Sequence, residues 1–164
     1  RAGVNMGLGT DTYPHNYLEE MRSAANHART IAGTVDDLKT ADIFNAATIG
    51  GAKALCRDDI GRLAAGARAD LVLVDLRNPS MMPVREPLRS LIYVAADRAI
   101  RDVYVEGQLV LENGTPLNID LATAAQALEE AQHRSLKQVP DRDWACRNAD
   151  ELAPMVFSTS PKLN

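Results

Sequence analysis

The character of this sequence changes at Ile60-Gly61-Arg62-Leu63-Ala64-Ala65-Gly66-Ala67-Arg68-Ala69-Asp70-Leu71-Val72. The first part of this stretch is polar and contains two glycines, which predicts an irregular connector. It leads into Leu71-Val72-Leu73-Val74-Asp75-Leu76, an apolar run with the β-branched residues that strands favour. Apolar residues at helical spacing dominate before the stretch, and β-type runs dominate after it. We therefore expect a helical part followed by a β part, joined by this connector.

The β part contains a second and clearer signal, a hairpin. Two β-rich runs flank Glu106-Gly107, a pair that suits a tight two-residue turn, and Asn113-Gly114 ends the second run. Residues 78–87 contain three prolines and predict an irregular loop. Residues 90–95 are a short apolar run, which we interpret as a further short strand.

The beginning of the chain combines glycines with a carboxylate, in Val4-Asn5-Met6-Gly7-Leu8-Gly9-Thr10-Asp11. The apolar segment is too short for a helix and predicts a strand that opens into a loop. A carboxylate at the junction of a buried parallel strand and its loop is where α/β enzymes place their chemistry. Aspartate is also a good helix N-cap, so Asp11 could equally cap the helix that follows. The residues alone leave both interpretations open.

Apolar residues recur at spacings of three and four from Leu18 to Ala32, which predicts a helix between a cap at Asn16 and an end at Gly33. An alanine-rich helix is expected to open at Thr40 or Asp42. A third is expected after Thr48, with Gly50-Gly51 letting another backbone approach.

A last helix is expected to start at Asp120 and to end near residues 139–140, with an irregular tail from Asp141. Its apolar face consists of Leu121, Ala125, Leu128 and Ala131.

The composition excludes several classes of protein. The chain has 164 residues, of which 46% are hydrophobic and 24% charged, as in globular domains. A net charge of -4 and 4% aromatic residues argue against nucleic acid or an anionic membrane as partner. No apolar run approaches the roughly 20 residues of a membrane span. Cys56 and Cys146 form no Cys-x-x-Cys pair, so we expect a reducing, cytoplasmic compartment and no disulfide framework. The chain begins at Arg1, and we expect that processing or truncation removed the true start.

The connector and first strand match every specified place of Ile-Gly-x-Leu-x-x-Gly-x-x-Ala-Asp-Leu, at residues 60–71. On this stretch the chain resembles the amidohydrolase superfamily, in the deaminase and chlorohydrolase branch that includes cytosine, guanine and triazine deaminases. The Val-x-Val-x-Gly-x-x-Val hairpin at residues 103–110 is similar to that family's, as is the helix at residues 46–55. Gly9-Thr10-Asp11 resembles the end of the family's eighth barrel strand.

The resemblance implies an α/β fold, namely the C-terminal portion of a metal-dependent (β/α)8 TIM barrel with part of the flanking small β-sandwich. Residues 1–57 would hold the last strand and the C-terminal helices of the barrel. Residues 58–118 would be the β-sandwich segment, and residues 119–164 the C-terminal helix and tail.

The resemblance also implies a metal site, with Asp11 as a ligand of one divalent ion, zinc or iron, and as a catalytic residue. Such an ion lowers the pKa of bound water towards 7, and the hydroxide would attack a ring carbon bearing an amino or halide leaving group. Asp11 would accept the water's proton and pass it to the leaving nitrogen. The family's His-x-His pair does not occur in this sequence, so the remaining ligands are expected outside this chain.

His15 follows Asp11 by four residues and is a candidate for substrate binding, because loops at the top of barrels often hold binding residues. The alternative is a solvated loop histidine. His27 and His133 lie in predicted helices, where we expect surface or interface positions.

The leading hypothesis is therefore the C-terminal part of a hydrolase of non-peptide carbon–nitrogen bonds, which deaminates or dechlorinates a purine, pyrimidine or triazine-like ring. Its partners would be a small N-heterocyclic substrate and the missing N-terminal part of the barrel; a homo-oligomer is left open. The alternative is a non-catalytic scaffold module or one subunit of a split enzyme. A nucleotide-binding Gly-x-Gly-x-x-Gly loop at Gly7 fails, because its third glycine would fall on Thr12.

Overall fold

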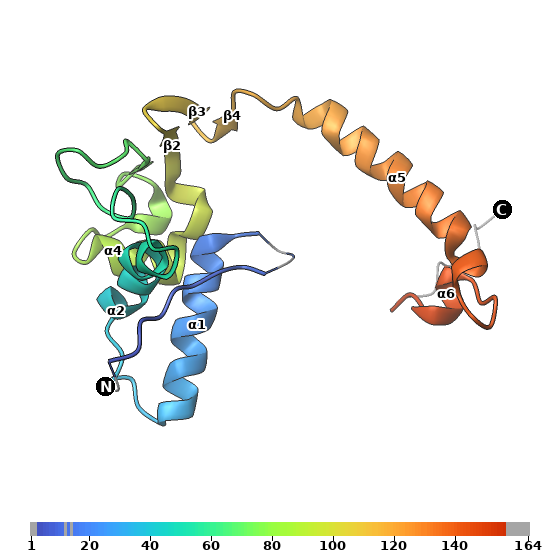
Figure 1. The fold of residues 1–164 in the computed structure, drawn as a ribbon, viewed down its shortest axis with the longest axis horizontal. Helices are drawn as coiled ribbons and strands as arrows, with labels where there is room; N and C mark the ends of the chain where they lie inside the picture. The colour runs from blue at the N-terminus through green and yellow to red at the C-terminus, as the bar shows by residue number, and fades with distance from the viewer. Residues whose placement is uncertain (1–2, 12, 14, 157–164) are drawn as a thin grey trace. The chain divides into compact units, whose positions relative to one another are not determined.

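The computed structural model describes residues 3–11, 13 and 15–156. By its internal contacts the chain divides into two compact units, Arg1–Asn118 and Ile119–Asn164. In Figure 1 the first unit runs from blue to yellow, and the second contains the orange helix α5.

The first helix, α1 (Tyr17–Ala32), has the ends that the sequence predicts. The side chain of Asn16 accepts a hydrogen bond from the Glu19 amide at 3.2 Å, which satisfies one of the free donors of the first turn. Gly33 ends the helix with φ of 67°, a left-handed conformation that glycine adopts without strain. Met21 and Ala25 are buried on the predicted apolar face.

The second helical stretch is continuous but changes its geometry in the middle. It starts as α2 (Thr40–Asn45), widens into the π-helical turn η1 (Ala46–Gly50) and closes as α3 (Gly51–Ala54). Such π-turns are rare insertions in α-helices and often lie at functional sites. The two alanine-rich helices predicted from the sequence are thus one element.

The prediction of a strand at residues 90–95 was wrong, because this run is helical. It forms α4 (Pro87–Ser90), the π-helical turn η3 (Leu91–Ala95) and the 3-10 turn η4 (Ala96–Ala99). Pro87 fits the first turn of a helix, where its missing N–H is not needed. A short apolar run does not distinguish strand from buried helix. The preceding loop contains a 3-10 turn, η2 (Pro79–Met81).

The core of the first unit consists of two small clusters. One joins α1 and α2 to η3 through Met21, Ala25, Ile43 and Ile92. The other consists of Met81, Leu91, Ala95 and Ala99, against which Val74 and Ile100 of the sheet pack. The segment of residues 79–99, which contains η2, α4, η3 and η4, therefore packs against both the helices and the sheet.

The sheet contains four antiparallel strands in the order β1-β2-β3-β4 among the described residues. They are β1 (Leu71–Val74), β2 (Ile100–Val105), β3 (Gln108–Glu112) and β4 (Thr115–Pro116). Both predicted β-runs thus lie in one sheet.

Two tight turns shape this sheet. Glu106 and Gly107 have φ of 52° and 80°, and Asn113 and Gly114 have φ of 49° and 77°. Positive φ at both central residues suits the right-handed twist of a hairpin. Glu106-Gly107 is the predicted hairpin turn, while Asn113-Gly114 leads into the additional strand β4.

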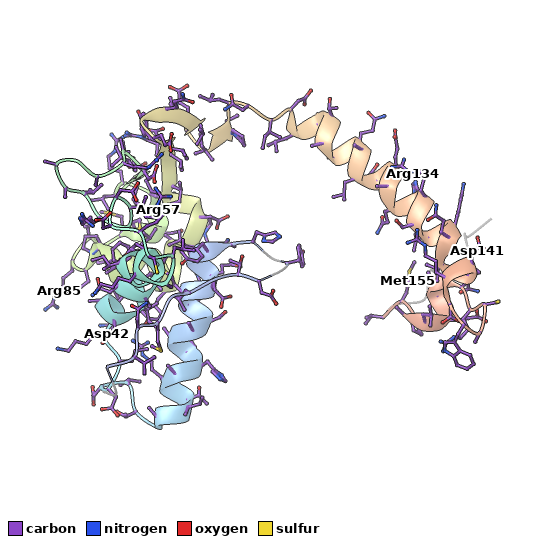
Figure 2. The ribbon with its side chains drawn as sticks, viewed as in Figure 1. Asp42, Arg57, Arg85, Arg134, Asp141 and Met155 are labelled. Carbon is purple, nitrogen blue, oxygen red and sulfur yellow. The ribbon has the colours of Figure 1, made fainter. Side chains whose placement is uncertain are left out.

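The connector is fixed at both ends. Gly61 has φ of 77°, and a Cβ there would lie 2.8 Å from the carbonyl oxygen of Thr48, so glycine is required on both grounds. The Asp59 carboxylate accepts hydrogen bonds from Arg57, labelled in Figure 2, and from Arg68. These two guanidinium groups hold the pKa of Asp59 well below its usual range, and the hydrogen bond from Arg57 has the larger effect. At the other end, Asp70 accepts a hydrogen bond from the Glu106 amide at 2.8 Å.

Residues 4–8 do not form the predicted strand in this structure; residues 3–11 are irregular. A strand needs a neighbouring strand for its ladder of hydrogen bonds, and the four described strands pair only with each other. The segment lies instead against η1, since Gly50 lets the carbonyl of Met6 approach. The predicted backbone approach at Gly50-Gly51 is thereby confirmed.

The second unit is built on α5 (Leu121–Arg142), which Asp120 caps through the amides of Ala122 and Thr123. The helix continues past the predicted end, with Pro140 inside it. Arg134, labelled in Figure 2, extends away from the α5 ribbon.

The tail contains a further short helix, α6 (Ala149–Leu152), where an irregular chain was expected. Arg147 forms an ion pair with Asp143, and this pair lowers the pKa of Asp143 to about 2. Residues 157–164 of the predicted tail lie outside the described residues. No helix in the described part of the chain has the length and apolarity needed to cross a membrane.

Gly50→Ala should destabilise the first unit by about 1–3 kcal/mol, the usual cost of overpacking. The added Cβ would lie 2.1 Å from the carbonyl oxygen of Met6, so backbone must shift. Gly51→Ala is the matched control, because its Cβ meets only the Ala46 oxygen at 3.9 Å. Urea unfolding of both variants makes the comparison, and equal midpoints would contradict the close approach.

Asp102 makes part of the sheet's stability dependent on pH. Its side chain is buried, accepts hydrogen bonds from the Asn113 amide and from Arg101, and these lower its pKa. Because the pKa of Asp102 is lower in the folded state, its ionised carboxylate stabilises the fold. This stability is fully present above the unfolded-state pKa of about 3.9 and is lost as the pH falls through the folded-state pKa. Asp102→Asn should therefore lower the urea midpoint at pH 7, with a difference from wild type that shrinks by pH 2.5. A difference that does not depend on pH would contradict this assignment.

Candidate functional site

The segment that precedes Asp11 is held by backbone carbonyls of the π-helical turn η1. The Asn5 side-chain amide donates to the carbonyl oxygen of Gly50 at 3.1 Å. The Leu8 amide donates to the carbonyl oxygen of Ala46 at 3.3 Å. The segment is thereby hydrogen-bonded to η1 at Asn5 and at Leu8, and the loop that contains Asp11 follows from Gly9.

Tyr17, the first residue of α1, fixes the segment a third time. Its phenol oxygen lies 3.0 Å from the carbonyl oxygens of both Leu8 and Ala47. Burial raises the pKa of Tyr17, and Glu20 raises it further. The phenol therefore stays protonated at neutral pH and shares its single proton between these two carbonyl oxygens.

Asp11 lies in the loop between Leu8, which is bonded to η1, and the start of α1 at Tyr17. It is exposed and has φ of 55°, a conformation that non-glycine residues adopt rarely and that Asp tolerates better than most. It does not cap α1, because Asn16 does. The interpretation of Asp11 as a helix cap was therefore wrong, and among the described residues its carboxylate makes no hydrogen bond or ion pair.

His15 is exposed in the same loop, with its Nδ1 atom 3.4 Å from the hydroxyl oxygen of Thr10. No hydrogen bond joins His15 to Asp11 among the residues that the structure describes. The structure thus places both candidate residues in one loop without pairing them. His27 and His133 are exposed on α1 and α5, as expected.

The residues present fit only part of a metal site. A carboxylate such as that of Asp11 is an accepted zinc ligand, but a catalytic zinc site has about three protein ligands. Within the described part of the chain, no three His, Cys, Asp or Glu side chains gather closely enough to hold a metal ion. The described residues alone therefore do not make a complete site.

The hollow on the outer surface of α1 is not a convincing alternative site. Its lining residues all belong to that one helix, from Glu20 to Thr30. No second element closes it, and its polar groups do not converge.

Sequence reasoning missed Tyr17 and Asn5, whose contacts decide where the Asp11 loop begins. The apolar pattern of α1 starts at Leu18, so the preceding tyrosine reads as an ordinary first-turn residue. Nothing in the local pattern predicts its acceptor at Ala47, which is 30 residues away in the chain.

Comparison with known proteins places these features in a family. The family model described as the amidohydrolase family matches residues 1–110. The 5-methylthioadenosine/S-adenosylhomocysteine deaminase of Pelotomaculum thermopropionicum is 37% identical over 143 residues, which covers 85% of this chain and 32% of that protein. The chain thus spans about a third of the length of the curated relatives that it matches.

Solved structures give the same result. An adenosine deaminase from Xanthomonas campestris with bound zinc is 34% identical, with a TM-score of 0.75, over 80% of this chain and 31% of that one. Atrazine chlorohydrolase from Arthrobacter aurescens TC1, complexed with zinc, is 28% identical, with a TM-score of 0.70, over 78% of this chain and 30% of that one. Family membership and these neighbours imply a TIM-barrel fold. The resemblance seen in the sequence is confirmed: the chain belongs to the amidohydrolase family.

Proposed function

We propose that this chain is the C-terminal part of a metal-dependent hydrolase that acts on carbon–nitrogen bonds other than peptide bonds. The reaction is hydrolytic deamination or dechlorination of a purine, pyrimidine or triazine-like ring. The relatives support this class of reaction, since they are named as deaminases and a chlorohydrolase. The observation that carries the proposal concerns Asp11. Its carboxylate is exposed and does not cap α1, and it lies in a loop whose base is held by hydrogen bonds.

We propose the following assignment of the chain to parts of the amidohydrolase fold. Residues 1–57 contribute the last strand and the C-terminal helices of the barrel, and residues 58–118 contribute a segment of the small β-sandwich. Residues 119–164 form the C-terminal helix and tail. The exposure of Val4 and Met6, at 75% and 68%, supports this division, because both belong to the segment that would be a barrel strand.

Asp11 acts in this proposal as a metal ligand and as a proton carrier. A bound zinc or iron ion would supply an activated water with a pKa near 7. The Asp11 carboxylate would accept the proton that this water gives up and, in a deamination, pass it to the leaving nitrogen; in a dechlorination chloride would leave as the anion and the proton would go to solvent. His15 faces solvent in the same loop and binds polar atoms of the ring. The remaining ligands come from outside this chain.

We also propose a cytoplasmic location. Cys56 and Cys146 are both free thiols in the structure, which suits a reducing compartment.

Asp11→Asn in the complete enzyme should lower kcat by at least roughly 10²–10⁴-fold, the usual contribution of a general acid–base group. The amide retains the shape of the side chain but cannot carry the proton. Amine or chloride release from a panel of aminated and chlorinated purines, pyrimidines and triazines measures the effect, with metal content determined in parallel. Activity near wild type with metal retained would remove Asp11 from the mechanism.

The 164-residue chain by itself should neither hold a catalytic metal tightly nor turn over substrate. Asp11 supplies one ligand where about three are needed. Exposed apolar side chains such as Val4 and Met6 should also favour association of the isolated chain. Metal analysis, light scattering and the same substrate panel test this. One tightly bound metal per chain with multiple turnovers would show that the site is located elsewhere. Activity restored only by adding a separate second protein would favour the split-enzyme alternative.

A further inference from the structure

The loop that carries both candidate site residues is closed at its base by one side chain. Leu8 precedes this loop and Tyr17 follows it, and the Tyr17 hydroxyl bonds the Leu8 carbonyl at 3.0 Å. Asp11 and His15 both lie between these two points in the chain. The bond therefore ties together the two ends of this loop, in whose described part the Thr10 hydroxyl also lies 3.4 Å from Nδ1 of His15.

The same hydroxyl also anchors the loop to a helix. Its second acceptor is the carbonyl of Ala47 in the π-helical turn η1, again at 3.0 Å. The neighbouring carbonyls of Ala46 and Gly50 accept from Leu8 and Asn5. Two carbonyls of this turn thus hold the chain before Asp11, and a third, that of Ala47, holds Tyr17 after it. The hydrogen bond of Tyr17 to Leu8 joins the chain before Asp11 to the chain after it.

The ring of Tyr17 and its hydroxyl have separate functions. The ring packs against the core cluster of Met21, Ala25, Ile43 and Ile92. The hydroxyl makes the two loop contacts. Tyr17→Phe therefore removes the contacts to Leu8 and Ala47 and keeps the packing, whereas larger changes would remove both.

We propose that Tyr17 is a positioning residue for Asp11: its hydroxyl clasps the base of the residue 9–16 loop onto the π-helical turn and so sets where the Asp11 carboxylate lies. The part of this proposal that concerns catalysis rests on the proposed function. Tyr17 itself touches no reacting atom in this assignment and acts through the backbone of Leu8. An error of about 1 Å in such placement can cost about 10²-fold in rate.

The first experiment measures the clasp without any activity. Amide hydrogen exchange at Leu8 is compared in the metal-free complete protein for wild type, Tyr17→Phe and the matched control Tyr13→Phe. Tyr13 lies in the same loop and its side chain is 90% exposed. The Leu8 amide donates to the Ala46 carbonyl, so its exchange reports how often the segment opens away from η1. Loss of the Tyr17 hydroxyl's contacts with the Leu8 and Ala47 carbonyls should make this opening, and exchange at Leu8, about three- to tenfold more frequent in Tyr17→Phe and leave it unchanged in Tyr13→Phe. Unchanged exchange in Tyr17→Phe overturns the clasp.

The second experiment separates positioning from general stability. In the complete enzyme, Tyr17→Phe should lower kcat by roughly 10- to 100-fold with KM within about twofold of wild type. Asp102→Asn, which loosens the sheet, serves as a destabilised control and should keep its kcat. Faster exchange with unchanged kcat, or an equal loss of kcat in Asp102→Asn, overturns the positioning role. If wild type turns over no member of the substrate panel, the proposed function fails, while the exchange experiment still decides whether the clasp exists.

Discussion

The structure of the first unit depends on how closely a backbone segment can approach the π-helical turn η1. A Cβ atom at residue 50 would lie 2.1 Å from the carbonyl oxygen of Met6, so only glycine allows this contact. On the same helix, the Thr48 carbonyl and the Ala52 side chain leave room for Gly61 but for no larger residue. One helical turn therefore positions both the segment that leads to Asp11 and the connector that leads to the sheet. Gly50 and Gly61 meet the same requirement, which is the absence of a side chain.

Hydrogen bonds to backbone acceptors, rather than ion pairs, determine the geometry around Asp11. Asn5, Leu8 and Tyr17 all donate to carbonyl oxygens, and those oxygens belong to the helical element α2–η1–α3. Ion pairs between described residues of this unit lie elsewhere, around Asp59, at Arg68 with Glu106, at Asp75 and beside Asp102. Exposed ion pairs contribute little to stability and weaken in salt. A loop held by carbonyls keeps its base fixed over a wide range of ionic strength, while its tip, with Asp11 and His15, remains accessible.

Membership of the amidohydrolase family explains why the first unit combines features that are incomplete by themselves. The relatives extend over about three times the length of this chain. In the proposed arrangement, the segment with Val4 and Met6 is a barrel strand whose neighbours come from the rest of that length. In that arrangement the helices would cover the barrel, and the antiparallel sheet would form part of the smaller β-domain. The exposed apolar side chains and the one proposed carboxylate ligand would then have the same explanation, because the residues that cover the apolar surface and complete the metal site would both come from the rest of the fold.

The sequence by itself determined the features whose cause is local. The cap at Asn16, the end at Gly33 and the hairpin at Glu106-Gly107 follow from the conformations that these residues favour, and the structure has all three. The motif at residues 60–71 identified the family, because its two glycines and Asp70 have fixed structural roles. Tertiary structure decided the rest. Residues 90–95 are helical because they pack into the core, and residues 4–8 are irregular because a strand exists only beside another strand. The clasp at Tyr17 joins residues 30 positions apart, and contacts of that range depend on packing that no local pattern encodes.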